Sequence, residues 1–338
     1  MRQTHSQFTL NKSIMKKLIL SLLTAASVGA VCAQSNTLSL SQMGDGNNAP
    51  VSQGGSGNQG TITTTGDNNQ VSFAQYGRGN IGTLSTTGNR NTASLQTWSA
   101  ENQVSMTQLG NDNTATINSF ISNNNQFSIY QNGEGNSAST VSSWGGNHQV
   151  SITQTGNRNQ SSVRASGYDG QAAPFDSYNN QVSITQTGND NFSNANIQYS
   201  SDNQISISQL GNNNNARTNH TGGANPGNGD YNQATISQTG DANQALIDQQ
   251  GNENQATLTQ SGTSNEARLL QGSSQNIATI VQEGTNNVLT GLESMSTSAL
   301  QVQGMGNSLL LNQTGDGNVL RFGQFGSNNT ATVTQRSY

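Results

Sequence analysis

Side chains that could do chemistry are few in this sequence, and they lie far apart. The main candidates are His148 and His220, because the only cysteine, Cys32, lies in an apolar segment near the N-terminus. Two isolated histidines without cysteines do not make a zinc site, which needs about four convergent ligands. Each histidine stands where a repeated pattern elsewhere has Asn, Gln or Ser, so a polar substitution is the simpler interpretation. We therefore expect no catalytic residue, no metal site and no cofactor.

Short glycine motifs are the second candidate chemistry. Gly-x-Gly occurs at 44–46, 133–135 and 315–317. A phosphate-binding loop needs a helix after its glycines, whereas each of these motifs is expected to be a β turn. Asp recurs too irregularly for a calcium-binding row. The charged residues of the turns are interpreted as solvated, and as scattered along the chain so that like charges do not stack. These residues are Asp112, Asp190, Asp241, Asp316, Arg78, Arg90 and Arg158. Trp98 and Trp144 are placed in or beside turns, without a specific role.

The composition argues against a compact enzyme. Of 338 residues, 30% are hydrophobic and 9% are charged, whereas 49 are Asn, 37 are Gln and 38 are Gly. An ordinary globular chain is nearer about 45–50% apolar and about 25% charged. A nearly uncharged chain rich in amides is typical of stacked β structure held by side-chain ladders.

The first 33 residues are predicted to be an N-terminal extension plus a secretory signal peptide. Lys16 and Lys17 precede an apolar run over 18–31, and cleavage is expected after Ala33, with translation starting at Met15. The remaining chain then has 8 Arg against 17 acidic residues, a net charge of 8 − 17 = −9. Without a basic face, a nucleic-acid partner is not expected.

An eleven-residue unit, N-x-Φ-x-Φ-x-Q-x-G-x-x, recurs from residue 36 to the C-terminus, with Φ usually Ala, Val, Ile or Leu. In the copy that starts at Asn254, Ala256, Leu258 and Gln260 share one parity and polar residues share the other. This alternation is typical of a half-buried strand, and Gly with a polar pair then reverses the chain. Each unit is therefore one strand and one turn.

Twenty-five units can be placed, and every lengthened step follows the second unit of a pair. A coil of about 22 residues and two strands therefore repeats, with one tight edge and one edge that tolerates insertions. We predict an all-β fold, an amyloid-like β-solenoid of about 12.5 two-strand coils over residues 34–338. Edge insertions are expected at 165–179, 219–231 and 293–306.

Asn and Gln at the strand ends are predicted to form ladders along the axis, each amide bonding its equivalent in the next coil. These ladders are expected to support self-assembly. Their predicted members are Asn102, Gln108, Asn113, Gln131, Gln154, Asn180, Gln186, Asn203, Gln209, Asn232, Gln238, Asn243, Gln249, Asn254, Gln260, Asn318, Gln324, Asn329 and Gln335.

The unit resembles the curlin repeat, Ser-x5-Gln-x4-Asn-x5-Gln, of which Gln42-x4-Asn47-x5-Gln53 and Gln238-x4-Asn243-x5-Gln249 match the last three positions. Asn or His148 replaces the leading Ser in most units. The resemblance implies a secreted subunit of curli, the extracellular amyloid fibres of Gram-negative biofilms. It also implies a curli-type nucleator and an outer-membrane secretion pore as partners, with possible adhesion to host or abiotic surfaces.

The terminal strands are the expected assembly sites. A solenoid that stays monomeric normally has caps over its end strands, and only Arg336-Ser337-Tyr338 follow the last predicted strand. We expect head-to-tail addition through these edges. Two other classes remain open: a soluble ice-binding solenoid, which the local Thr61-x-Thr63 and Thr257-x-Thr259 rows would suit, and a monomeric adhesin.

Overall fold

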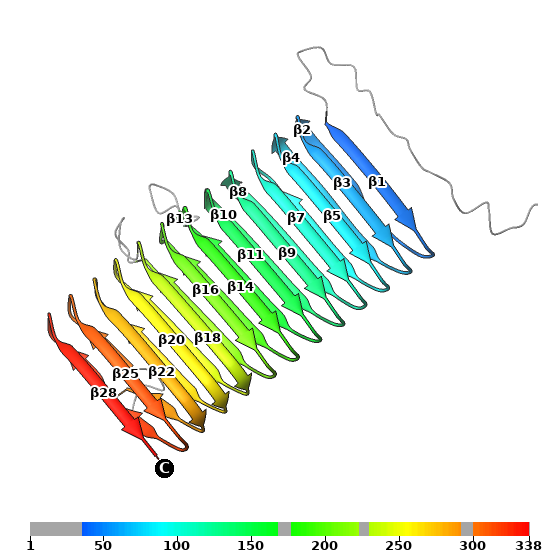
Figure 1. The fold of residues 1–338 in the computed structure, drawn as a ribbon. Helices are drawn as coiled ribbons and strands as arrows, with labels where there is room; N and C mark the ends of the chain where they lie inside the picture. The colour runs from blue at the N-terminus through cyan, green and yellow to red at the C-terminus, as the bar shows by residue number, and fades with distance from the viewer. Residues whose placement is uncertain (1–35, 168–176, 223–229, 292–299, 338) are drawn as a thin grey trace, which may run out of the picture.

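The computed structural model describes residues 36–167, 177–222, 230–291 and 300–337, and these residues form strands and turns without a helix. The described part accordingly has no helix that could cross a membrane. Two parallel sheets stack into the rod shown in Figure 1. The predicted all-β solenoid is confirmed. The predicted signal segment, with Ala33, lies outside the described residues.

Sheet A contains the first strand of every coil. Each of its strands between the two end strands pairs in parallel with the strand of the coil before and the coil after, as the order in the sheet shows. Its 13 strands are β1 (Thr37–Met43), β3 (Gln59–Thr65), β5 (Ile81–Thr87), β7 (Gln103–Leu109), β9 (Gln126–Asn132), β11 (Gln149–Thr155), β14 (Gln181–Thr187), β16 (Gln204–Leu210), β18 (Gln233–Asp241), β20 (Gln255–Thr263), β22 (Ile277–Thr285), β25 (Ser308–Thr314) and β28 (Thr330–Arg336).

Sheet B contains the second strand of every coil. Its main path is β2 (Val51–Ser56), β4 (Gln70–Arg78), β6 (Thr92–Thr97), β8 (Thr114–Asn123), β10 (Ser137–Gly146), β12 (Gln160–Ser166), β15 (Phe192–Gln198), β17 (Asn215–Thr221), β19 (Gln244–Gln250), β21 (Glu266–Gln271), β23 (Val288–Thr290) and β26 (Val319–Arg321). The short strands β13 (Ser177–Tyr178), β24 (Leu300–Gln303) and β27 (Gly323–Phe325) extend it. Thirteen strands in sheet A against twelve positions in sheet B make the predicted 12.5 coils.

The core is one coil thick and lies between the sheets. In β14, Val182 and Ile184 are buried while Gln181, Ser183 and Thr185 are exposed. The same parity in β15 buries Ala195 and Ile197. Because each coil stacks its aliphatic residues on those of its neighbours, a continuous core forms from few apolar residues per unit.

Glycine is required where each sheet A strand turns into sheet B. Gly188 has a φ of +115°, and a Cβ there would collide with the carbonyl oxygen of Gly211 in the next coil. Asp190, two residues later, has a φ of +58°. A left-handed residue close to a stacked backbone explains why the unit keeps Gly at this position.

The structure corrects the predicted bounds of the insertions. Ala165 and Ser166 belong to β12, and Asn219 to Thr221 belong to β17, so the chain leaves sheet B later than expected. The insertion predicted at 293–306 is not at an edge. It interrupts a strand position, because β23 ends at Thr290 and β24 resumes beside β21 at Leu300.

Candidate functional site

The asparagines that open the strands form two continuous rows, one for each sheet. In the row beside sheet B, the backbone N–H and the Nδ2 of Asn159 both donate to Oδ1 of Asn136, at 3.0 and 3.1 Å. Nδ2 of Asn159 also donates to the carbonyl of Gly188 in the following coil (2.8 Å). One side chain thus links three coils. Of the predicted ladder residues, Asn113, Asn243 and Asn318 lie in this row, and Asn102, Asn180, Asn203, Asn232, Asn254 and Asn329 lie in the row beside sheet A.

A glutamine row closes the sheet A strands. Nε2 of Gln131 donates to Oε1 of Gln154 (2.9 Å) and to the carbonyl of Thr114 in sheet B (3.0 Å). The row therefore joins successive coils and also ties the two sheets together across the core. Its predicted members are Gln108, Gln131, Gln154, Gln186, Gln209, Gln238, Gln260 and Gln335, which are joined by bonds of 2.8–3.1 Å through Gln282 and Gln313.

The matching row of sheet B is interrupted, which corrects the prediction of a ladder bond for every Gln. Gln249 donates to Gln271 (2.8 Å), but its other neighbour in register is His220. Gln324 lies in register with Val302, and its Nε2 donates to the carbonyl of Ser308 (3.4 Å). Oε1 of both glutamines has no hydrogen-bond partner among the described residues.

Both histidines occupy ladder positions in the interior. The N–H of His148 donates to Oδ1 of Asn125 (2.9 Å), and its Nδ1 accepts from the N–H of Asn180 (3.4 Å), so the imidazole replaces an Asn in the row beside sheet A. Burial lowers the pKa of His148 to about 4 and that of His220 to about 3. Neither ring nitrogen of His220 has a partner among the described residues, and these residues contain no group of three metal-ligating side chains.

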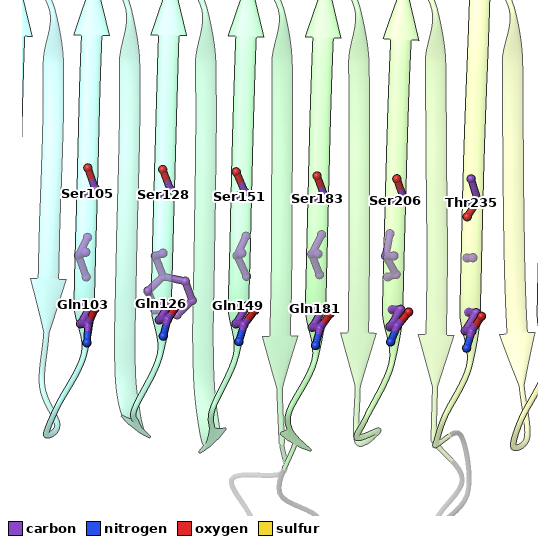
Figure 2. A pocket seen from close by; sticks show the side chains of 18 of the residues that line it. Gln103, Ser105, Gln126, Ser128, Gln149, Ser151, Gln181, Ser183, Ser206 and Thr235 are labelled. Atoms are coloured by element: carbon purple, nitrogen blue, oxygen red, sulfur yellow. The ribbon is translucent and has the colours of Figure 1, made fainter.

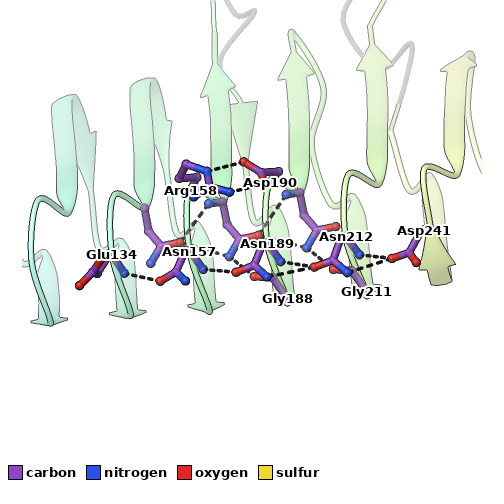
Figure 3. Close-up of polar contacts among 12 residues, drawn as sticks. Glu134, Asn157, Arg158, Gly188, Asn189, Asp190, Gly211, Asn212 and Asp241 are labelled. Atoms are coloured by element: carbon purple, nitrogen blue, oxygen red, sulfur yellow. Dashed lines mark hydrogen bonds and ion pairs between the residues drawn. The ribbon is translucent and has the colours of Figure 1, made fainter.

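A further ladder runs along the tight turns and was missed from the sequence. In many of these turns the Asn or Asp after the turn glycine accepts a bond from the backbone of the preceding coil: Asn157 N–H donates to Oδ1 of Asn189 (3.0 Å), and Asn189 N–H to Oδ1 of Asn212 (3.0 Å). Figure 3 shows this row continuing to Asp241. The signal was present, because most tight turns carry Asn or Asp at this position.

Charges in the same turns pair along the axis. Arg158 makes two bonds to the carboxylate of Asp190 (2.8 and 2.7 Å), and Arg90 makes the same contact with Asp112 in earlier coils (Figure 3 for the first pair). Each arginine lowers the pKa of its carboxyl partner by hydrogen bonding. The predicted scattering of charge is in part an alternation of opposite charges one coil apart.

Two surface features could contact other molecules. A groove of about 710 Å³ follows the outer face of sheet A, between one row of Gln and one row of Ser that ends in Thr (Figure 2). The regular Thr rows that an ice-binding face would need are absent from this groove.

The second feature is a group of aromatic side chains at the edge opposite the tight turns. Trp98, which directly follows β6, is exposed and contacts Tyr76 (ring centroids 4.8 Å apart) and Phe120 (6.1 Å), so it belongs to an aromatic stack over three coils. Trp144 lies within β10, not in a turn.

The ends of the rod have unpaired strand edges. Among the described residues, β1 pairs only with β3, and β28 pairs only with β25. Their inward aliphatic side chains are incompletely covered, since Leu38 is 46% exposed and Val333 is only partly buried. Such an edge is a template for another strand of the same kind.

Comparison with known protein families identifies this repeat in two segments. The curlin associated repeat matches residues 229–262 and 304–336. Both matched segments are curlin-type repeats. The matched segments span β18 to β20 and β25 to β28, and the same parallel pairing continues through the other coils of the rod. No curated protein matches the chain.

Proposed function

We propose that this chain is a structural subunit that assembles head to tail into curli-type extracellular amyloid fibres. The observation that carries the proposal is that, among the described residues, the edges of both sheets are unpaired at both ends of the rod. A partner strand that continued the existing register would pair the backbone groups and cover the partly exposed aliphatic residues.

The amide rows favour a directional join. Within the rod, the N–H of each row asparagine donates to the side chain of the preceding row residue, as in Asn58 to Oδ1 of Asn36 and Asn329 to Oδ1 of Asn307. The last acceptors of the two rows, Oδ1 of Asn318 and Asn329, receive no bond from the described residues. At the other end, the N–H of Asn36 and of Asn47, the first donor of each row, has no acceptor in the described part of the chain. Head-to-tail contact joins donors to acceptors.

The biological setting of the proposal comes from the curlin repeat. We propose that the segment 1–33 directs export and is cleaved after Ala33, and that the chain then passes through an outer-membrane secretion pore. The fibre would grow on a curli-type nucleator at the surface of a Gram-negative bacterium. The fibre would serve biofilm matrix and adhesion to host or abiotic surfaces. The role is structural, with no catalysis, no cofactor and no nucleic-acid partner.

Assembly can be tested with residues 34–338 incubated at micromolar concentration. We expect fibres with a thioflavin-T signal and a diffraction spacing of about 4.8 Å along the axis. The matched variant is Thr332→Pro. Counting the opening Asn of each unit as position 1, residues at even positions direct their N–H toward the following coil, as Gln59 does toward Asn80. Thr332 is at position 4 of the unit that Asn329 opens, so this change removes an outward donor of β28 and no bond to β25.

Thr332→Pro should slow elongation strongly, while Thr332→Ser elongates like the parent chain. The soluble forms of all three should have the same circular dichroism spectrum. A parent chain that stays monomeric without a thioflavin-T signal overturns the proposal.

A further inference from the structure

The described rod contains an odd number of strand positions, 13 in sheet A and 12 in sheet B. This number constrains how a second copy can join the first. Resting on the head-to-tail assembly proposed above, we propose that successive copies are related by a half-turn about the fibre axis. Sheet A of one copy then continues sheet B of the next.

Strand counting separates the two possible joins. If copies stacked without rotation, β1 of the second copy would pair with β28, and a slot one strand wide would remain in sheet B between β26–β27 and the second β2. The edge groups on both sides of that slot would have no strand to pair with. With a half-turn, the second β1 follows β26–β27 and the second β2 follows β28. Both sheets then continue without a gap.

The half-turn keeps the pairing parallel. Strands of the two sheets run in opposite directions, because each coil reverses at its turns (Figure 1). A half-turn about the rod axis exchanges the sheets and reverses strand direction together. The inward parity is also unchanged, since both sheets bury the odd positions of the unit.

The inward side chains match across the rotated join. The last sheet A unit and the first sheet B unit have the same four inward residue types, and the last sheet B unit differs from the first sheet A unit at one of four. Without rotation, small Ala and Val would instead stack on two Leu. The matched quartets are Asn329, Ala331, Val333, Gln335 on Asn47, Ala49, Val51, Gln53, and Asn318, Leu320, Phe322, Gln324 on Asn36, Leu38, Leu40, Gln42.

The turns at the ends of the rod permit the exchange of edges. In the first coil, Gly44 and Gly46 have φ of +112° and +70°, and Gly55 and Gly57 at the other edge have +90° and +70°. In the last coil, Gly315 and Gly317 have φ of +94° and +67°, against +92° and +58° for Gly326 and Asn328. The units at both ends are eleven residues long on either edge. The two halves of a terminal coil therefore have nearly the same shape.

Pro50 does not block this join. β2 begins directly after Pro50, and the carbonyl of Pro50 accepts from the N–H of Phe73 in β4 (3.1 Å). A residue in a parallel strand directs its N–H and C=O to the same neighbour, so the donor that proline lacks faces β4 and not the free edge. The free edge of the first sheet B unit uses Ala49, Val51 and Gln53.

Disulfide trapping tests the proposal, because the chain after Ala33 has no cysteine. A half-turn places exposed Thr334 of one copy beside exposed Ser52 of the next, whereas unrotated stacking places it beside exposed Ser41. In-register neighbours on parallel strands lie within about 4.4–6.8 Å between Cα atoms, the range a disulfide spans. Two variants are compared, Thr334→Cys with Ser52→Cys and Thr334→Cys with Ser41→Cys.

Fibres of each variant are oxidised, dissolved and analysed by non-reducing electrophoresis. We expect the Ser52 variant to lose its monomer band to a ladder of covalent oligomers, and the Ser41 variant to remain monomeric. The reverse pattern, or fibres in which neither variant is trapped, overturns the half-turn while leaving assembly intact. Absence of fibres from the cysteine-free parent overturns the proposed function itself.

The same proposal is tested by electron cryomicroscopy of parent fibres. A half-turn gives an axial advance of about 60 Å per copy and an exact repeat only after two copies, about 120 Å. The edge that carries the insertions then alternates between opposite sides of the fibre. A single-copy repeat with the insertions on one side contradicts it.

Discussion

Nε2 of Gln154 donates to Oε1 of Gln186 over 2.8 Å although 32 residues separate them in the chain. In coils without a long insertion, the same bond joins residues 22 or 23 apart, as in Gln238 to Gln260. The strands β11 and β14 therefore pair in register although the segment that separates them is longer than in other coils. Which residues pair is therefore determined by their place in the coil and not by the number of residues between them.

Breaking the glutamine row should destabilise the rod. Oε1 of Gln186 accepts from Gln154 and Ser161, and its Nε2 donates to Gln209 (2.8 Å). Gln186→Ala leaves buried polar groups with fewer partners, so we expect a loss of about 1–3 kcal/mol in the free energy of unfolding. The control is Gln181→Ala in the same strand, which is exposed and should cost less than about 0.5 kcal/mol. Urea unfolding of fresh monomer measures both, and equal effects would refute a role for the row.

Replacing a stacked turn glycine should cost more than replacing an unstacked one. Gly188→Ala introduces a methyl group against the carbonyl of Gly211 at a φ of +115°, and we expect a loss of at least about 1–3 kcal/mol. Gly317, with a φ of +67°, has open space around its Cβ position. Gly317→Asn should be nearly neutral, because Asn tolerates this region and Asn213 occupies the equivalent place in another turn. Thermal unfolding of the two variants gives the comparison.

Acid should weaken the folded chain through its buried histidines. The folded pKa values of about 4 for His148 and about 3 for His220 lie below the ordinary 6.5. The contribution of the two histidines to the free energy of unfolding is complete above about pH 6.5. It falls by up to about 1.4 kcal/mol per pH unit for each histidine as the unfolded chain takes up protons, and levels off below the folded pKa.

The double variant His148→Asn with His220→Gln should flatten this dependence between about pH 6.5 and 3. Asp248 acts in the opposite direction, because burial raises its pKa and its contribution is lost as the pH rises through that value. It is present in both proteins, so the difference between their unfolding curves isolates the histidines. Parallel curves over this range would show that the histidines do not titrate on unfolding.

The turn charges should matter little and only at low salt. Arg158 and Asp190 form an exposed pair, and exposed pairs are screened and weak. Arg158→Asp places two carboxylates one coil apart and should lower the melting temperature slightly in low salt, with the effect vanishing at high salt. Adding Asp190→Arg restores an opposite pair and should recover the loss. A decrease that persists in high salt would point to packing and not to charge.

The strands and their inward residues followed from the sequence because each unit specifies its own conformation. Alternation at period two placed Ala256 and Leu258 on the same face of their strand, and the structure buries both in the core. Glycine with a polar pair marked each turn, because a left-handed residue is needed there. These preferences are local, so they are readable in one unit and repeated along the chain.

Contacts along the axis needed the tertiary structure. Three features depend on which residues lie one coil apart. They are the pairing of Arg158 with Asp190, the turn row through Asn189, and the register of Gln324 with Val302, which leaves Gln324 outside a glutamine row. Insertions of different length change that separation from coil to coil, and one of them interrupts the strand position of β23 and β24. The sequence alone determined the period, the parity and the number of strand positions. The hydrogen-bonding register between backbones decided which side chains meet, because neighbours in the stack are set by pairing between coils and not by distance along the chain.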